Sequence, residues 1–573
     1  MNLDIKEKDG FLIMEDFPEN CIFNKVKTGC GATTIALTNN KNYIIAVPTT
    51  DLVINKCYPS KDKDDKDLVW KKSEIVSGVS PLNANLFGLY GRFTVSTKTK
   101  LKKFLNKEGV KKIICTYDKV EALISLINPQ EFKLLTDEYH DLFKQYLFRH
   151  KAVNGVLDHY NKFKSYCFLS ATPIPDFVKP QIFKDMTEYV ANWKSIDKIT
   201  IYPYKSGKAY ETAANIIKQY QDIGYFVLDD VKSEEAYFFV NSVREIKKIL
   251  DKTTLTNDDC RVICADNEKN STKLEGFKIS NSASKSKRFT FVTCKAFEGV
   301  DFHSETALCF IVSNGYNKHT LISVDMDIPQ IAGRIRTKTN PFKNKIVHIF
   351  NPKKVNYYVP LAVKKQELDK ELAAAKERVQ KLNEQTLGED AQKQQDAELK
   401  KLGADTYIVK RGDKYEVNDM IAKLKLYIYW TIHIIYRSAE ALQEAYETFG
   451  SSVAKGYEWN IAGEDIMKNI LNPKQFRDCL KRFCDLKNKG AMLSDSEKQE
   501  LETISTKYPK LVEGYSKLGV KTLKRLRTIK AITAALEELE EGSTHYHTTN
   551  LLPPYLPEGK SKIRQAWGYT TNH

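Results

Sequence analysis

A glycine-containing segment near the start of the chain has the composition of a loop that binds phosphate. Its residues run Val26-Lys27-Thr28-Gly29-Cys30-Gly31-Ala32-Thr33-Thr34 and continue into the helix-forming Ile35-Ala36-Leu37. Glycines let such a loop curl, so that its backbone N–H groups and the positive end of the next helix converge on phosphate oxygens. A hydroxyl at the start of the helix then binds Mg²⁺, and Thr33 occupies that place. The segment Lys27 to Thr34 therefore predicts a site for a nucleotide and its magnesium ion.

The loop departs from the usual pattern at one position. The residue before the magnesium-binding hydroxyl is normally a lysine that reaches the β and γ phosphates, and here it is Ala32. Lys27, at the beginning of the loop, is the lysine that we expect to fold over the phosphates instead. Two other interpretations stay open: the segment is an ordinary glycine turn, or it is the remnant of a nucleotide site that no longer turns over.

Two adjacent carboxylates follow another apolar run. Phe132 to Leu135 lead into Thr136-Asp137-Glu138-Tyr139-His140. The carboxyl ends of strands are where α/β proteins place their sites. We predict that Asp137 holds Mg²⁺ through its water shell, while Glu138 orients and deprotonates the attacking water. A pair of surface acids is the alternative.

Three later segments place polar residues after strand-like runs or on a helix. They are Ser170-Ala171-Thr172-Pro173, the stretch from Thr293 and Lys295 to Gly299 and Asp301, and Gln330-Ile331-Ala332-Gly333-Arg334-Ile335-Arg336. Because phosphoryl transfer relies on cations aimed at the terminal phosphate, Arg334 and Arg336 are our candidates for that role. Ser170 and Thr172 could relay the state of the site. Taken singly, these segments also fit a plain turn and a basic helix that pairs with surface acids.

The elements that must position these residues alternate between short β-branched or aromatic runs and amphipathic stretches of helix length. This alternation predicts parallel sheets covered by helices. The candidate strands are Tyr43 to Val47, Lys112 to Cys115, Lys133 to Thr136, Ser165 to Leu169, Tyr225 to Leu228, Arg261 to Ala265, Thr290 to Thr293, Leu308 to Val312 and Lys345 to Phe350. A proline-rich break near residues 175–200 divides them, so we expect α/β domains over residues 1–180 and 195–352.

Strand signals vanish after Asn351. An apolar helix face with 4-3-4-3 spacing follows, made of Leu368, Leu372, Ala375, Val379 and Leu382. With a turn at Gly388-Glu389-Asp390, this pattern predicts a helical hairpin or coiled coil over residues 353–405. We expect a helical C-terminal domain over residues 406–545 and an extended tail over residues 546–573.

Composition limits the class of protein. The 573 residues carry a formal charge of +16, which favours a polyanionic partner, although a lysine-rich solvated surface would give the same number. Eleven cysteines lie scattered in apolar runs, without the spacing of a disulfide framework or a zinc site. The charged start has no signal sequence, and Lys425 and His433 interrupt the longest apolar stretch. We expect a cytoplasmic protein that does not bind membranes.

The order of these segments resembles that of the motifs of superfamily 2 helicases. TGCGATT, AVPTT (Ala46 to Thr50), CTYD (Cys115 to Asp118), TDEYH, SATP, CKAFEGVD and QIAGRIR are similar to motifs I, Ia, Ic, II, III, V and VI. The resemblance covers roughly residues 20 to 340. DEYH is nearest to the DEAH-like branch, and the lysine-deficient loop resembles helicases of tailed, crAss-like bacteriophages.

The resemblance implies two tandem RecA-like domains, followed by a mainly α-helical region, with ATP and Mg²⁺ bound between the two domains. It implies nucleotide contacts from Thr28 to Thr34, Gly299, Asp301, Asp137, Glu138, Gln330, Arg334 and Arg336. It implies nucleic-acid contacts from Pro48, Thr49, Thr116, Tyr117, Thr293 and Lys295, and coupling of hydrolysis to domain movement by His140, Ser170 and Thr172. No glutamine motif that recognises adenine is evident before Lys27.

The expected activity is an ATP-dependent helicase or translocase on nucleic acid, with DNA favoured over RNA, in phage genome replication or recombination. Replication proteins are expected partners of the helical C-terminal region. One alternative is a double-strand translocase or remodelling ATPase without unwinding. Another is an inactive nucleic-acid-binding protein that keeps the fold. The expected active enzyme would lose most of its ATP hydrolysis on Glu138→Gln or Lys27→Ala substitution.

Overall fold

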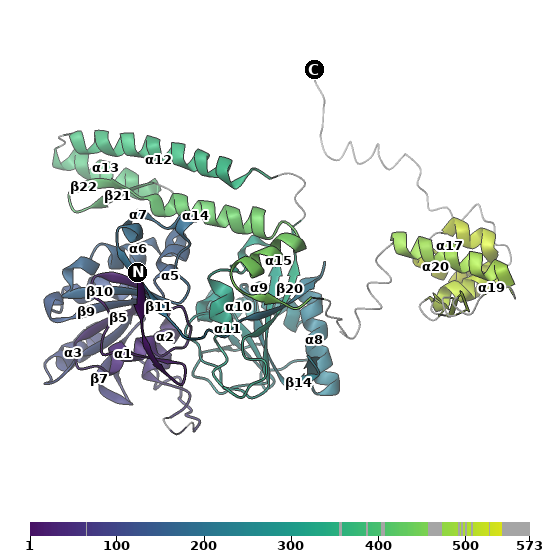
Figure 1. Ribbon diagram of the computed structural model, residues 1–573, viewed down its shortest axis with the longest axis horizontal. Helices are drawn as coiled ribbons and strands as arrows, with labels where there is room; N and C mark the ends of the chain where they lie inside the picture. Colours follow the sequence, from purple (N-terminus) through teal and green to yellow (C-terminus); the bar gives the residue numbers. More distant parts are fainter. Residues whose placement is uncertain are drawn as a thin grey trace, which may run out of the picture. The chain divides into compact units, whose positions relative to one another are not determined.

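The computed structural model of the chain divides into two compact units, Met1–Trp459 and Asn460–His573. The first unit contains two α/β lobes, called lobe 1 (residues 1–192) and lobe 2 (residues 199–353), and a helical part (Figure 1). The structure describes residues 1–62, 64, 66–353, 358–385, 388–402, 407–455, 473–490, 493, 497–498, 501–502, 504–505, 508–526 and 528–540. The tail expected at residues 546–573 lies outside these ranges.

Lobe 1 is built on a nine-stranded sheet whose core strands are parallel. In spatial order the strands are β1 (Asn2–Asp4), β11 (Thr187–Asn192), β4 (Cys21–Asn24), β10 (Ser165–Ser170), β9 (Lys133–Asp137), β5 (Tyr43–Val47), β8 (Lys112–Thr116), β7 (Asn83–Leu89) and β6 (Gly78–Ser80). Only β6 pairs antiparallel within this sheet. Neighbouring residues such as Ile44 and Ile45 belong to apolar clusters on opposite faces, as a sheet covered by helices on both sides requires.

Helices cover both faces of the lobe 1 sheet. They are α1 (Ala32–Thr38), α2 (Thr50–Cys57), α3 (Val95–Leu105), α4 (Val120–Ile124), α5 (His140–Lys144), α6 (Tyr146–Leu157) and α7 (Gln181–Lys184). The register pairs Leu169 with Asp137 and Ser170 with Asn24. The phosphate loop after Asn24 and the acidic pair therefore leave the same edge of the sheet.

Lobe 2 repeats this design with an eight-stranded, wholly parallel sheet. In spatial order its strands are β17 (Ile279–Ser280), β16 (Cys260–Ile263), β18 (Phe289–Val292), β15 (Glu235–Phe239), β19 (Ala307–Asn314), β20 (Lys345–Asn351), β12 (Thr200–Lys205) and β23 (Ser452–Val453). Its helices are α8 (Ala209–Ile223), α9 (Val243–Leu250), α10 (Glu268–Leu274) and α11 (Asp327–Ala332).

The helical part of the first unit contains an arm and a bridge between the lobes. The arm consists of α12 (Leu361–Glu384), α13 (Glu389–Leu402) and a hairpin of β21 (Ile408–Arg411) with β22 (Lys414–Val417), and α12 contacts α14 (Asp419–Trp430) as well as β22 (Figure 1). Helix α14 buries Leu424 and Tyr427 in a cluster of lobe 1, whereas α15 (Ala439–Thr448) buries Leu442 and Tyr446 in lobe 2. Helices α14 and α15 form the bridge, which therefore packs against both lobes.

The fold class expected from the sequence is confirmed: two tandem RecA-like α/β domains with parallel sheets are followed by a mainly helical region. The C-terminal sequence expected to form one helical domain over residues 406–545 is divided between the two units, because α14 and α15 bury their apolar faces on the lobes. Strand β11 extends lobe 1 beyond the expected residue 180. The expected strand at Tyr225 to Leu228 forms β13 (Phe226–Leu228), which pairs with β14 (Val231–Ser233) outside the main sheet.

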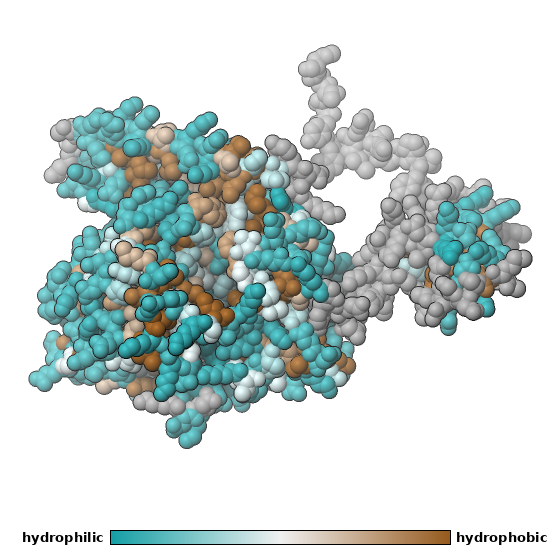
Figure 2. Space-filling view, viewed as in Figure 1, coloured by the Kyte–Doolittle hydropathy of each residue, from teal (hydrophilic) through white to brown (hydrophobic). Residues whose placement is uncertain are grey.

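The second unit has its own apolar core. Helices α17 (Pro473–Lys489), α19 (Pro509–Leu526) and α20 (Ile529–Glu540) contribute Phe483, Leu511, Leu523 and Ile532 to it. Among the described residues, no helix combines the length and apolar character that crossing a bilayer demands. Hydrophilic residues cover most of the face of the first unit shown in Figure 2, with apolar residues in smaller patches.

Candidate nucleotide site between the lobes

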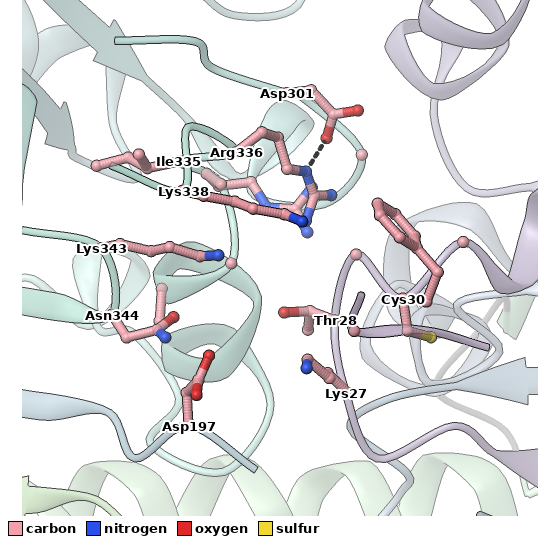
Figure 3. Close-up of a pocket in the computed structure, with 18 of the residues that line it drawn as sticks. Lys27, Thr28, Cys30, Asp197, Asp301, Ile335, Arg336, Lys338, Lys343 and Asn344 are labelled. Atoms are coloured by element: carbon pink, nitrogen blue, oxygen red, sulfur yellow. Dashed lines mark hydrogen bonds and ion pairs between the residues drawn. The ribbon is translucent and has the colours of Figure 1, made fainter. Parts of the chain in front are cut away.

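A cavity of about 820 Å³ lies between the two lobes and collects most of the expected nucleotide-binding residues. Its lobe 1 wall includes the phosphate loop and the acidic pair, and its lobe 2 wall includes Gly299 and Arg334. Asp301 and Arg336 also belong to the lobe 2 wall (Figure 3). Side chains from segments far apart in the sequence thus face one space.

The phosphate loop has the backbone that the sequence predicts. Gly29 and Gly31 have φ values of 67° and 76°, which are favourable for glycine, and α1 begins at Ala32 directly after Gly31. The Thr33 hydroxyl donates a 2.6 Å hydrogen bond to Asp137 Oδ2. A hydroxyl and a carboxylate oxygen therefore lie side by side at the positive end of a helix, which is the donor set that Mg²⁺ accepts.

The lysine that reaches the acidic pair is Lys25, which the sequence analysis did not identify. Its Nζ lies 2.8 Å from Glu138 Oε1 and 3.3 Å from Asp137 Oδ1, and the side chain is buried. Burial alone would lower the pKa of Lys25, but the carboxylates of Asp137 and Glu138 raise it above its usual value. A fixed positive charge therefore stands where the loop would meet the terminal phosphates.

Strained backbone at Val26 directs Lys25 inward. Val26 has a φ of 59°, an unfavourable conformation for a β-branched residue, and its N–H donates a 2.9 Å hydrogen bond to Asn24 Oδ1. The Lys25 backbone is held by Ser170, whose carbonyl accepts from its N–H at 2.8 Å, and by the Trp193 indole, which donates to its carbonyl at 2.8 Å. These contacts turn the chain so that Lys25 points to the acidic pair and Lys27 points toward Trp193.

Lys27 lines the cavity but does not reach the acidic pair. Its Nζ lies beside Gly10 and 5.2 Å from the centroid of the Trp193 ring. The expected replacement of the missing lysine by Lys27 therefore stays a prediction that the geometry does not favour. Lys25 is the lysine whose ammonium group contacts the acidic pair.

The acidic pair is fixed from behind by Tyr117. Its hydroxyl donates to the carbonyls of Asp137 at 2.7 Å and Glu138 at 3.0 Å. Glu138 itself has a φ of 51°, so the chain turns sharply at the catalytic candidate. Burial alone would raise the pKa of Asp137, but Lys25 and the Thr33 hydroxyl lower it, which keeps this carboxylate charged.

The expected coupling residues form one hydrogen-bonded group behind Glu138. His140 Nδ1 lies 2.9 Å from the Ser170 hydroxyl, which is 3.5 Å from the Thr172 hydroxyl. Gln330 of lobe 2 joins this group, since its Nε2 donates to Glu138 Oε2 at 2.9 Å and to Thr172 Oγ1 at 3.2 Å. A change in the contacts of Glu138 can therefore reach the other lobe through a single side chain.

The two arginines of lobe 2 occupy different positions in the cavity. Arg334 is buried and donates to the Gln330 backbone carbonyl at 2.7 Å and to its side-chain oxygen at 3.2 Å, which holds Gln330 in place. Arg336 donates from Nε to Asp301 Oδ1 at 2.6 Å, and its guanidinium lies against Gly29 of the phosphate loop (Figure 3). Of the two, Arg336 is thus the one that touches the loop.

The lobes meet closely at three glycines. An added β-carbon would collide with Arg336 at Gly29, with Leu52 at Gly299 and with the Thr28 side chain at Gly333. Of these three glycines, only Gly333 has a φ, −77°, that alanine adopts without strain. A methyl group at position 333 would therefore act on the approach of the lobes alone.

We expect Gly333→Ala to lower kcat/KM for ATP hydrolysis about a hundredfold, because a misplacement near 1 Å in a closing site has effects of that size. Steady-state hydrolysis measures kcat/KM, and a thermal melt of the same protein shows whether the variant is folded. Gly207→Ala, in open space on lobe 2, is the matched control. Full activity of Gly333→Ala would show that hydrolysis does not need this closed contact.

Behind the nucleotide site, a buried cluster of charges joins the lobes. Lys144 of α5 pairs with Asp327 and lies 3.3 Å from Glu298 Oε1, both in lobe 2. Burial and the charge of Glu298 raise the pKa of Asp141 to about 7. Burial alone would also raise the pKa of Glu298, but Lys144 and His140 lower it to about 2. His140, Asp141 and Glu298 have atoms that a metal could use, but the Lys144 ammonium already lies among the carboxylates. We interpret this cluster as an ionic contact that fixes α11.

The residues expected to contact nucleic acid are mostly engaged within the protein. Thr49 caps α2, the Pro48 carbonyl accepts from Arg149, and Lys295 pairs with Asp51 at 2.7 Å. Thr116 and Thr293 are buried. Tyr117 is 1% exposed and holds the acidic pair, so its expected contact with nucleic acid does not fit its position. The roles of the other five stay predictions.

Comparison with known proteins assigns no family to the chain. No family model and no curated protein matches it. Among the solved structures that resemble it are Dbp5 from S. cerevisiae, bound to RNA and ADP BeF3 (13% identity, 59% of this chain, 80% of that chain, TM-score 0.37), helicase Lhr from Mycobacterium smegmatis, bound to ssDNA and AMP-PNP (11%, 87%, 70%, 0.37), and the ATP-dependent Type ISP restriction-modification enzyme LlaBIII, bound to DNA (10%, 96%, 41%, 0.35). These similarities are too low to carry an argument about activity.

Proposed function

We propose that the chain hydrolyses ATP in the cavity between its lobes and couples hydrolysis to movement on nucleic acid. The observation that carries the proposal is the convergence of Lys25, Thr33 and the acidic pair of lobe 1 with Arg336 of lobe 2 around one cavity. A glycine turn or surface acids would not require this convergence.

The site residues divide the chemistry among them. Thr33 and Asp137 would hold Mg²⁺, which supplies charge neutralisation to the phosphates. Glu138 accepts hydrogen bonds from Lys25 and Gln330, and it is the carboxylate placed to orient an attacking water and take its proton. Lys25 and Arg336 place positive charge where negative charge develops on the terminal phosphate.

Closure of the lobes completes this site. Opening of the lobes after hydrolysis would change the distance between the points at which they contact a nucleic-acid strand bound across both. Gln330 supports this coupling, because it touches Glu138 and Thr172 from the opposite lobe. The sequence resemblance favours DNA and a role in bacteriophage genome replication or recombination, and these finer assignments stay predictions.

Steady-state ATP hydrolysis with and without single-stranded DNA or RNA tests the proposal. We expect hydrolysis that rises several-fold with the preferred strand and depends on Mg²⁺. Absence of hydrolysis in a folded protein would favour the alternative of an inactive nucleic-acid-binding protein. A strand-displacement assay then separates a helicase from a translocase that does not unwind.

A further inference from the structure

Three lysines from the two lobes meet at the outer part of the cavity. Lys338 and Lys343 of lobe 2 reach into the space that Lys27 faces from lobe 1, with Arg336 beside them (Figure 3). Within the part of the chain that the structure describes, none of these three ammonium groups has a carboxylate within ion-pair distance. The Lys338 ammonium instead lies 3.5 Å from the Asp9 carbonyl and 5.9 Å from the Phe11 ring.

The electrostatic surroundings of Lys343 show the mutual repulsion. Burial lowers the pKa of Lys343, Asp197 opposes that effect, and Lys27, Arg336 and Lys338 lower the pKa further. The positive charge of Lys343 is thus less favourable in the presence of Lys27, Arg336 and Lys338. A closed cleft without an anion holds like charges from both lobes together, whereas a polyanion in the same space would turn this repulsion into attraction.

We propose that Lys27, Lys338 and Lys343 form an outer phosphate subsite, whose occupation by phosphate oxygens draws the lobes together. The inference rests on the proposed function and extends it from the deep site around Lys25 to the rest of the phosphate chain. The ligand that this subsite recognises is a polyphosphate, so the phosphate chain, rather than the base, supplies the force for closure. Ammonium groups suit this task because they bind phosphate as point charges.

Calorimetric binding of inorganic triphosphate with Mg²⁺ tests the subsite without turnover. We expect the whole protein to bind this probe with a Kd within about tenfold of that for ATP. The double variant Lys338→Gln with Lys343→Gln should raise both Kd values about tenfold for each lysine, since a hydrogen bond to a charged group is worth about that factor. Both lysines lie at the surface or are half-buried, so the variant should fold.

Lys269→Gln with Lys273→Gln is the matched control, because it removes the same charge from α10 of lobe 2, away from the cavity lining. Unchanged triphosphate affinity in the Lys338 and Lys343 double variant would overturn the subsite, as would a loss of single-stranded DNA binding alone, which would assign the lysines to a nucleic-acid backbone. The two proposals fail separately. A protein that binds triphosphate through these lysines but never hydrolyses ATP would refute only the proposed function.

Discussion

Lys25→Ala is expected to lower kcat for ATP hydrolysis about a thousandfold, the effect of removing one preorganised charge from a developing oxyanion. Lys25 is buried against Asp137 and Glu138, and among the described residues it is the lysine that forms ion pairs with both carboxylates. Lys27→Ala, which removes a lysine only two residues away, should mainly raise KM. Steady-state kinetics on both variants compare the two assignments directly. A larger loss of kcat in Lys27→Ala than in Lys25→Ala would restore the role that the sequence suggested for Lys27.

A second variant separates catalysis from folding, because removing Lys25 also leaves two carboxylates without their buried partner. Ala32 stands where the usual phosphate loop has its lysine, and it lines the cavity. Lys25→Ala combined with Ala32→Lys should therefore recover part of the lost rate. Removing Lys25 alone also raises the pKa of Asp137, since Lys25 is the group that lowers it most, and moves the acid limb of the rate profile to higher pH. A folded Lys25→Ala enzyme with the parent pH profile would contradict this account.

The sequence was sufficient to predict the alternating architecture and the edge of the sheet that carries the site. Strands such as Tyr43–Val47 and Lys133–Asp137 are short, apolar and followed by polar turns, so their local pattern indicates both their type and their direction. Strands β4 and β15 were missed. Cys21–Asn24 and Glu235–Phe239 are fully paired within their sheets, and that pairing is a tertiary property.

The position of Lys25, which the sequence pattern did not indicate, has a local cause. Whether Lys25 or Lys27 points inward depends on the left-handed backbone at Val26, and a β-branched residue there runs against every local preference. The available signal was a polar Asn24-Lys25 pair at the end of an apolar run, a position that deserved the same weight as Asp137. The burial of Tyr117 has a different reason, because a motif resemblance places a residue at a strand end without showing which way its side chain points.

Glu138→Gln should lower ATP hydrolysis by a factor between about a hundred and ten thousand, the usual contribution of a general base. Glutamine keeps the size of the side chain, and its carbonyl oxygen can still accept the hydrogen bond from Lys25, so nucleotide binding should persist. The measurement is a pair: steady-state hydrolysis, and equilibrium binding of a fluorescent ATP analogue. Glu108→Gln, an exposed glutamate of lobe 1, is the control for the lost charge.

The same variant tests how the lobes communicate. Gln330 belongs to lobe 2 and Glu138 to lobe 1, so their contact forms when the lobes are closed. A nucleotide that stays bound and unhydrolysed should therefore keep the lobes closed. We therefore expect Glu138→Gln to change its affinity for single-stranded nucleic acid when ATP is added, and to keep that altered affinity for as long as ATP remains. Hydrolysis at the parent rate would remove Glu138 from the base role. Loss of ATP binding together with hydrolysis would show instead that its carboxylate is needed to assemble the site around Lys25.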